Sequence, residues 1–205
     1  MRLQTSWARL LGALLLAGLA APVALADCDY VKIIYIRVGD AAPAFTCKDD
    51  HGKAWKLSEH VGRHRYIVLY FYLGDFLKPS VQQAKAFRND LGQFAAQGAE
   101  VVGVSGDGLK AHRLFKEKYG VNFPLLSDKD GAVAKAYGVS ISGGGILRIK
   151  DSRGKEITLE RGVTPSRWLW VIDKKGCVGY KDTNADPVKS SKQVLAFLVK
   201  QNKKR

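Results

Sequence analysis

The feature that most constrains this chain is an unbroken run of apolar and aromatic residues, YIVLYFY, over residues 66–72. A strand with one face in water alternates apolar and polar side chains, whereas this run has no polar face. It is therefore typical of a central strand that is covered on both sides. A short loop follows, and from Ser80 onward apolar residues such as Ala84, Phe87 and Leu91 recur at helical spacing. The sequence thus predicts an α/β domain built around a strand, a loop and a helix start.

The rest of the chain supplies the other layers of such a domain. Strands are expected over residues 30–38, 100–107, 123–128, 168–173 and 177–181, and a hairpin of two short strands over 45–58. Helices are expected over 109–120, over 131–138, and from residues 186–187 toward the C-terminus. Alternating segments around DSRG predict an inserted hairpin around 146–160. This order predicts a mixed central sheet with helices on both faces, in which the last two strands are antiparallel.

The first 26 residues are not expected to belong to that sheet. Arg2 and Arg9 precede the apolar stretch LLGALLLAGLAAPVALA, which ends in an A-x-A cleavage pattern at residues 24–26. This pattern is typical of a secretory signal peptide, and the interrupting glycines and proline argue against a transmembrane anchor. We therefore expect a signal peptide over 1–26 and one domain over 27–205, in a protein that is periplasmic or secreted.

The formal net charge of +14 bears on the class of partner. An exported protein meets little nucleic acid, so the charge points instead to acidic partner groups or to electrostatic contact with the envelope surface. Most lysines are scattered, however, and only the C-terminal KQNKKR forms a run. Solubility is therefore the plainest role of most of this charge, and the oligomeric state stays open.

The sequence contains three cysteines, Cys28, Cys47 and Cys177, and no C-x-x-C motif. The missing motif removes the usual dithiol exchange pair. An oxidising compartment would allow one disulfide among the three thiols, and all three pairings remain open. Cys47 falls in the predicted first hairpin, where a buried small apolar side chain is the plainer interpretation.

Four segments also match a known family in order, over roughly residues 38–181. They read VGDAAPAFTCKDDHGKAWKLSEHVGRHRYIVLYFY, VVGVSGD, FPLLSDKDGAVAKAYGV and RWLWVID. Together they resemble the peroxiredoxins, the alkyl hydroperoxide reductase/thiol-specific antioxidant family. The segment over 120–139 is most similar to the bacterioferritin-comigratory, or Q-type, branch. The resemblance implies a thioredoxin-like fold and, for the family, an antioxidant thiol peroxidase activity.

The family's catalytic motif, Pro-x-x-x-Thr-x-x-Cys, falls on LGDFLKPS in this chain. The resemblance places Leu73 at the proline, Leu77 at the threonine and Ser80 at the peroxidatic cysteine. Lys85 occupies the resolving-cysteine position of many Q-type members, and Arg167 matches the family arginine. In the family, a helix N-terminus and that arginine lower the thiol pKa. A serine hydroxyl has no comparable oxidation chemistry.

These differences lead to two main functional hypotheses. The first is an exported protein that has lost peroxidase activity and binds a small anion or an acidic partner near Ser80 and Arg167. The alternative is a thiol-dependent peroxidase or oxidoreductase that uses Cys47 or Cys177. A scaffold that acts through its basic surface is a weaker third. A hydrolase would need a histidine in the matched catalytic segments, so Ser80 is expected only to cap its helix.

Metal binding has little support in the sequence. His60 and His64 are four residues apart, and Glu59 is the acid nearest to them along the chain. Two ligands do not make a site. We therefore expect neither a metal nor another cofactor.

Overall fold

The computed structural model describes residues 35–150 and 154–204, so the predicted signal peptide and Cys28 lie outside the described residues. In chain order the elements are β1 (Thr46–Asp49), β2 (Ala54–Lys56), α1 (Leu57–His60), β3 (Tyr66–Phe71), α2 (Lys78–Ala96), β4 (Ala99–Ser105), α3 (Leu109–Tyr119), β5 (Leu125–Ser127), α4 (Ala132–Ala136), β6 (Ile141–Lys150), β7 (Glu156–Pro165), β8 (Leu169–Asp173), β9 (Val178–Asp182) and α5 (Ser190–Lys203). Among the helices of this described part, none combines the length and apolar character needed to cross a membrane.

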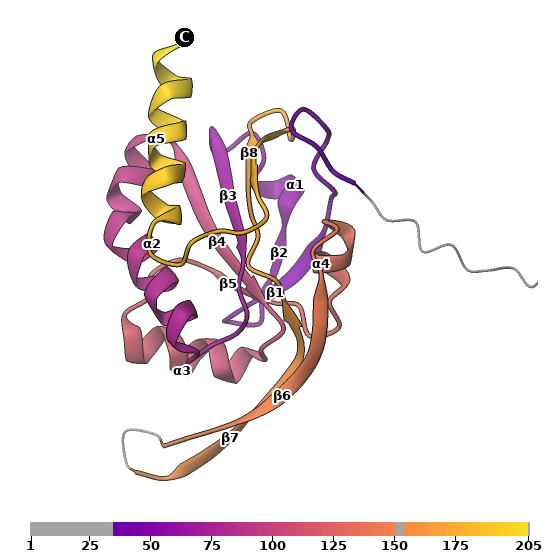
Figure 1. The fold of residues 1–205 in the computed structure, drawn as a ribbon, viewed down its shortest axis with the longest axis vertical. Coiled ribbons are helices and arrows are strands. Elements are labelled where there is room, and N and C mark those ends of the chain that lie inside the picture. Colours follow the sequence, from indigo (N-terminus) through magenta and orange to yellow (C-terminus); the bar gives the residue numbers. More distant parts are fainter. Residues whose placement is uncertain (1–34, 151–153, 205) are drawn as a thin grey trace, which may run out of the picture. The chain divides into compact units, whose positions relative to one another are not determined.

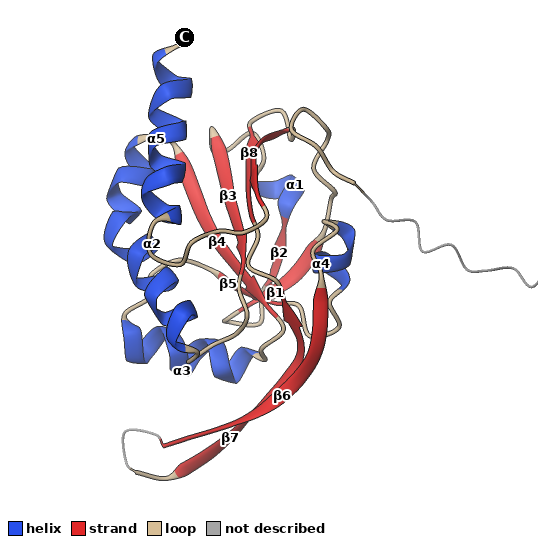
Figure 2. Cartoon of the chain, in the orientation of Figure 1, coloured by secondary structure: helices blue, strands red, loops and turns tan. Residues whose placement is uncertain are grey.

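One mixed sheet forms the centre of the domain, in the strand order β2-β1-β5-β4-β3-β8-β9 (Figures 1 and 2). Strands β3, β4 and β5 are parallel, whereas β1 pairs antiparallel with β5, and β8 with β3. The β8–β9 hairpin is antiparallel, as its short connection predicts. The three parallel strands therefore end at the same edge of the sheet, and the loops that follow them gather there.

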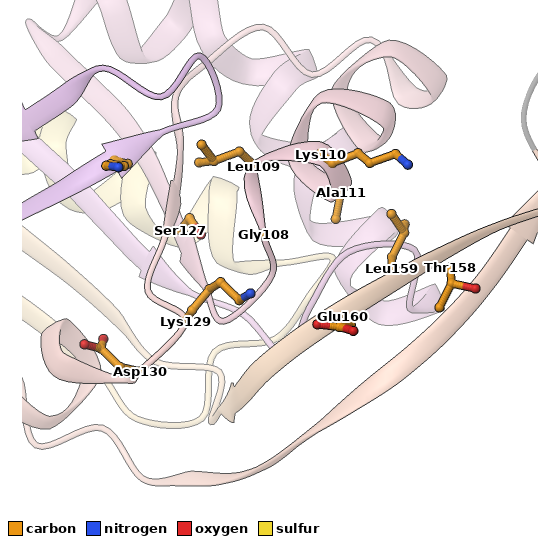
Figure 3. A pocket seen from close by; sticks show the side chains of 11 residues that line it. Gly108, Leu109, Lys110, Ala111, Ser127, Lys129, Asp130, Thr158, Leu159 and Glu160 are labelled. Carbon is orange, nitrogen blue, oxygen red and sulfur yellow. The ribbon is translucent and has the colours of Figure 1, made fainter.

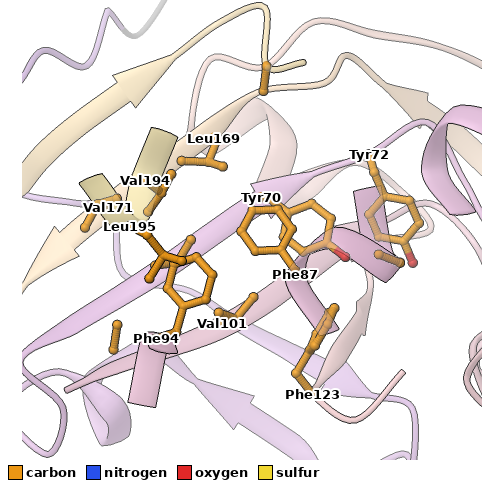
Figure 4. Close-up of a cluster of buried hydrophobic side chains, with 14 of the residues drawn as sticks. Tyr70, Tyr72, Phe87, Phe94, Val101, Phe123, Leu169, Val171, Val194 and Leu195 are labelled. Carbon is orange, nitrogen blue, oxygen red and sulfur yellow. The ribbon is translucent and has the colours of Figure 1, made fainter. Parts of the chain in front are cut away.

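Strand β3 is buried at every position and faces two cores. Val68 and Tyr70 belong to a core that includes side chains of α2, α3 and α5, and Figure 4 shows the part around Phe87. Ile67 and Leu69 belong to a second core, which α4 and the N-terminal hairpin complete. Removing one large buried apolar side chain typically costs about 2–5 kcal/mol, so both helix layers depend on this strand. The prediction of helices on both faces is confirmed.

The ends of the helices follow from local chemistry. Pro79 lies in the first turn of α2, where its missing N–H is not needed and its fixed φ suits the helix. Helix α3 ends at Gly120, whose φ of 63° is left-handed and favours glycine. The last helix begins at Ser190, later than predicted. Asp186 Oδ1 instead accepts hydrogen bonds from the backbone N–H groups two and three residues further on, which makes a turn before the helix.

The predicted inserted hairpin is present as β6 and β7, two strands of ten residues each. It extends away from the sheet as a curved ribbon (Figure 1). Its base is fixed to the loop after β4, because Gly162 N–H donates to the Gly106 carbonyl at 2.9 Å, and Asp107 forms an isolated bridge with Arg161. A Cβ at Gly106 would lie 2.0 Å from the carbonyl oxygen of Val163. The two backbones therefore approach closely enough to require glycine.

The strand predicted over residues 30–38 is wrong in its described part, because residues 35–37 form no strand. Ile36 is buried in the second core while Tyr35 is 76% exposed, so the side chains alternate as predicted, but the backbone pairs with no strand. The backbone just after these residues contacts the start of β9 and the turn before it at separate points: Gly39 N–H donates to the Val178 carbonyl at 2.8 Å, Val178 N–H donates to the Asp40 carbonyl at 2.9 Å, and Ala41 bridges Cys177. Strand propensity is a weak signal where no neighbouring strand runs alongside.

We expect Gly106→Ala to lower the free energy of unfolding by about 1–3 kcal/mol, because the added methyl group would clash with backbone rather than with a flexible side chain. Gly143→Ala in β6 is the matched control, since nothing lies within 4 Å of its Cβ position. Urea unfolding of both variants measures the difference. Equal midpoints would show that the hairpin base tolerates the extra volume.

Candidate functional site

The candidate site is the loop between β3 and α2, at the sheet edge where the parallel strands end. Leu77 is the N-cap residue of α2, and Ser80 lies in the first helical turn. Phe76 has a φ of 62°, a left-handed conformation that costs a non-glycine residue about 1–3 kcal/mol. A loop of this kind persists only where its surroundings hold it in place.

Ser80 is buried, and its Oγ has no hydrogen-bond partner among the described residues. The expectation that Ser80 caps α2 is therefore wrong. The physical reason is register: a capping side chain must stand before the first turn, and that place belongs to Leu77, which offers no hydrogen bond. The unpaired Oγ also lacks the neighbouring base that a hydrolase nucleophile requires.

Ser80 and Arg167 do not line a common cavity. Arg167 lines a cavity of about 430 Å³ together with Leu73, and Ser80 is not among the residues that line it. Burial lowers the pKa of the Arg167 guanidinium, and the negative charge of Asp186 opposes this effect. Lys85 is exposed and lies over an aromatic ring, 5.4 Å from its centre. The structure therefore does not show the shared anion pocket that the sequence suggested.

The buried carboxylate of Asp75 fixes the loop between β3 and α2 through hydrogen bonds. Asp75 accepts a hydrogen bond of 2.8 Å from the Tyr72 hydroxyl and pairs with Nδ1 of His112, also at 2.8 Å. The side chains of Asp75 and His112 are fully buried. Burial by itself lowers the pKa of His112, but the charge of Asp75 and the hydrogen bond to it outweigh burial, so that the pKa is raised. The loop carboxylate thus favours the charged form of the histidine.

A second carboxylate joins the loop to the hairpin. The backbone N–H of Asp75 donates to Oδ2 of Asp107 at 2.8 Å, and Nε of Arg161 in β7 donates to Oδ1 of Asp107 at 3.1 Å. The Arg161 guanidinium fills the space beside Gly74, where a Cβ would lie 2.1 Å from it. Burial and then the charge of Asp75 raise the pKa of Asp107, and Arg161 opposes this rise. The loop between β3 and α2, the loop after β4, and β7 are thereby connected through buried polar groups.

The sequence reasoning missed this network. It places all histidines outside the matched catalytic segments, yet His112 contacts Asp75 inside one of them. Two signals could have revealed it. One is Asp75, a charged residue that follows an entirely buried strand after a short interval. The other is His112, which shares the buried face of α3 with Ala111 and Phe115. A histidine on an apolar helix face requires a buried polar partner.

The two described thiols differ in their surroundings. Cys47 is buried, and its Sγ donates to the Ser127 carbonyl at 3.1 Å. Burial, together with the charge of Asp128, raises the pKa of Cys47 to about 12. Cys177 is partly exposed at the turn between β8 and β9. Within the described residues neither thiol forms a disulfide.

A wider cavity of about 740 Å³ lies between the start of α3, the loop after β5, and β7 (Figure 3). Its walls include three lysines, Lys48, Lys110 and Lys129, and two acids, Asp130 and Glu160. Neither described thiol lines it. It is therefore a hollow lined by charges of both signs, without a redox group of its own in the described part of the chain.

At the other end of the sheet, three side chains that can bind metals lie together. The ligand atoms of His60, His64 and Glu100 are all within 4.8 Å of one another. The acid expected beside the histidines, Glu59, pairs instead with Lys56 at 2.9 Å. The expectation of only two ligands is therefore wrong, because strand β4 brings in a third from a distant part of the sequence.

Comparisons with known proteins identify relatives of this chain. Residues 38–181 match the model of the AhpC/TSA family. Peroxiredoxin Q, chloroplastic, of Oryza sativa subsp. japonica is 38% identical over 161 residues, which make up 78% of this chain but 65% of the relative. The crystal structure of peroxidoxin BcpB from Mycobacterium tuberculosis matches with a TM-score of 0.67 at 26% identity, over 81% of this chain and 98% of that one.

A further solved structure is that of the bacterioferritin comigratory protein of Xanthomonas campestris, studied for its alkyl peroxide reduction activity. It matches with a TM-score of 0.63 at 28% identity, over 81% of this chain and 97% of that one. These relatives confirm the thioredoxin-like mixed fold and the Q-type resemblance. They contradict the first functional hypothesis: these relatives are named as peroxiredoxins, and one was studied for alkyl peroxide reduction, so the interpretation as a binder of a small anion or acidic partner that has lost peroxidase activity is wrong.

We expect the contribution of His112 to stability to fall as the pH rises. Its pKa in the folded state is raised above the unfolded value of about 6.5. The contribution is therefore fully present below about pH 6.5 and is lost as the pH rises through the folded-state pKa. The difference in unfolding free energy between the wild type and His112→Gln should be larger at about pH 6 than at about pH 9.

Urea unfolding across this pH range measures the difference. His51→Gln is the comparison: His51 also lies beside a carboxylate, 3.2 Å from Asp50, but it is 77% exposed, so solvent screens that pair. If the difference in unfolding free energy between the wild type and His112→Gln increased with pH, it would contradict a charged pair of His112 and Asp75.

Proposed function

The chain belongs to the AhpC/TSA family, and on that premise we propose that it is a thiol-dependent peroxidase that reduces hydroperoxides through Cys177. The observation that carries the proposal is the contrast between its two described thiols. Cys177 is partly exposed, whereas Cys47 is buried and has a pKa of about 12. The names of the relatives support the class of reaction.

The reaction needs sulfur, and the predicted nucleophile position holds Ser80. A serine hydroxyl cannot follow the stepwise oxidation that a thiolate undergoes. Peroxide reduction therefore depends on a cysteine elsewhere in the chain. With a pKa of about 12, Cys47 would be a thiolate in only about one molecule in 10⁵ at neutral pH. It would also have to give up its hydrogen bond to Ser127.

The setting of Cys177 suits an accessible nucleophile. Its backbone N–H donates to Oδ1 of Asp173 at 3.0 Å, and its carbonyl accepts from Asp173 N–H at 2.8 Å, so the turn is fixed. Lys174 and Lys175 in that turn are exposed cations. Reactive thiols are typically found in partly exposed, electropositive surroundings.

Hydroperoxide reduction at Cys177 would take place in two stages, oxidation of the thiolate and its reduction by a dithiol. The thiolate attacks the O–O bond of the hydroperoxide and takes one oxygen, which forms a sulfenic acid. The other oxygen leaves as an alcohol, or as water, after it accepts a proton. A thiol of a dithiol reductant then condenses with the sulfenic acid and releases water, and its second thiol cleaves the mixed disulfide. The two electrons thus come from a dithiol reductant, which is the partner that the proposal requires.

The compartment is part of the same proposal. Residues 1–26 have the pattern of a signal peptide, so we place the activity outside the cytoplasm. The net charge of +14 would favour contact with an anionic envelope surface.

Cysteine variants test the nucleophile. Cys177→Ser should lower hydroperoxide consumption by at least about tenfold in the presence of a dithiol reductant, whereas Cys47→Ser should change it by less than about twofold. Trapping of sulfenic acid, followed by peptide mass spectrometry, should locate the oxidised sulfur at Cys177. A rate lost only in Cys47→Ser would move the chemistry to that thiol. A rate that is indifferent to Cys28→Ser, Cys47→Ser and Cys177→Ser would overturn the proposal.

A second substitution tests the loop. In a Cys177→Ser background, Ser80→Cys should restore weak peroxidase activity, because a thiol in the first turn of α2 is favoured as the thiolate. The apolar Leu73 and Leu77 leave the peroxide unoriented, and such misplacement can cost about 10²-fold in rate. Adding Leu77→Thr should therefore raise the rate further.

Ser190→Cys is the matched control for this test. Ser190 is also buried, also lies in the first turn of a helix, and also has an Oγ without a hydrogen-bond partner among the described residues. Equal activity from the two cysteines would show that the loop has no special role. Full activity from Ser80→Cys alone would contradict the role given to Leu73 and Leu77.

A further inference from the structure

Three side chains with metal-binding atoms meet at the sheet edge opposite to the candidate loop. His60 is the last residue of α1, His64 lies two residues before the start of β3, and Glu100 is the second residue of β4. Because β3 and β4 are parallel, the residues at their starts share one edge of the sheet. The proposed peroxidase chemistry uses none of the three.

The distances within the cluster suit one small cation. Nδ1 of His60 lies 2.8 Å from Oε2 of Glu100, and Nε2 of His64 lies 3.3 Å from the same oxygen. All three ligand atoms lie within 4.8 Å of one another. Tetrahedral Zn²⁺ with bonds of about 2.0–2.1 Å separates its ligand atoms by about 3.3 Å. Only small movements of the side chains would therefore be needed to close around an ion.

The backbone between the two histidines is shaped to bring them together. The chain leaves α1 at Val61, which has an extended conformation, and turns at Gly62, whose φ of 89° favours glycine. The carbonyl of His60 accepts hydrogen bonds from the N–H groups of Arg63 and His64, at 3.2 and 3.3 Å. The two imidazole planes are nearly parallel, at 14°. The pairing thus comes from a turn and not from the face of a helix.

The cluster is held on one side and open on the other. The Trp55 ring stacks on the His60 imidazole with centroids 4.2 Å apart, which restricts its rotation. The side chains of His60 and Glu100 are 20% and 16% exposed, whereas His64 is 42% exposed. Two ligands are therefore fixed in advance, the third can close over an ion, and water can reach the remaining coordination positions.

We propose that His60, His64 and Glu100 form a binding site for Zn²⁺ or a similar borderline divalent cation. Two imidazoles and one carboxylate are the ligand set of zinc sites that keep one position for water. Imidazole selects such cations over Mg²⁺ and Ca²⁺, which prefer oxygen ligands. A bound ion would tie α1 and the turn after it to β4, and would stabilise the folded chain by mass action.

Calorimetric titration of the whole protein, purified without a polyhistidine tag and freed of metal with a chelator, tests the site. We expect one equivalent of Zn²⁺ to bind with a Kd of about 10 μM or tighter, and Mg²⁺ at the same concentration to give no binding heat. His64→Gln and Glu100→Gln should each weaken Zn²⁺ binding by at least about tenfold. Zinc should raise the thermal midpoint of the wild type and not that of either variant.

Two controls separate this site from other zinc ligands. His51→Gln removes an exposed histidine outside the cluster and should leave Zn²⁺ binding unchanged. Co²⁺ in place of Zn²⁺ reports the ligands, since thiolate ligation would give a sulfur-to-metal charge-transfer band that nitrogen and oxygen ligands do not give. Such a band, an absence of Zn²⁺ binding, or binding that survives both His64→Gln and Glu100→Gln would each overturn the site.

Discussion

Strand β3 has no face that can meet water, and the architecture follows from that constraint. Its six positions are all buried, and alternate side chains enter opposite cores. Apolar layers are therefore required on both sides. The helices α2, α3 and α5 contribute to one, and α4 with the N-terminal hairpin contributes to the other. Parallel pairing of β3 with β4 then requires a crossover, which α2 supplies. The same pairing brings the loops after both strands to one edge.

At that edge, buried charged groups determine the conformation of the loop between β3 and α2 more than apolar packing does. Asp75 is fully buried, and such a carboxylate is tolerated only with compensating partners. Tyr72, His112 and, through its backbone, Asp107 provide them. This network accounts for a left-handed Phe76, because the residue beside it cannot move without exposing or unpairing a charge. The inserted hairpin takes part as well, through Arg161.

The sequence predicted most of the fold, because the strongest signals come from elements that are apolar on one or both faces. It failed where tertiary contacts decide. Residues 35–37 alternate like a strand but have no strand beside them, and the final helix starts after a turn made by Asp186. The site was predicted less well. The position of Ser80 follows from its place after β3, but its lack of a partner depends on the helix register. His112 and Glu100 contact partners that are distant in the sequence, and the spacing of residues along the chain does not predict such contacts.

The length of β3 separates two regions of the molecule. The six residues span five rises of about 3.3 Å, which place the ends of the strand about 17 Å apart. The cluster of His60, His64 and Glu100 lies at one end, and the network of Asp75 and His112 at the other. Free-energy changes at sites this far apart, without shared partners, usually add to within about 0.3–0.5 kcal/mol. The two ends are thus thermodynamically modular, so that one can diverge in evolution, or be redesigned, while the other keeps its stability.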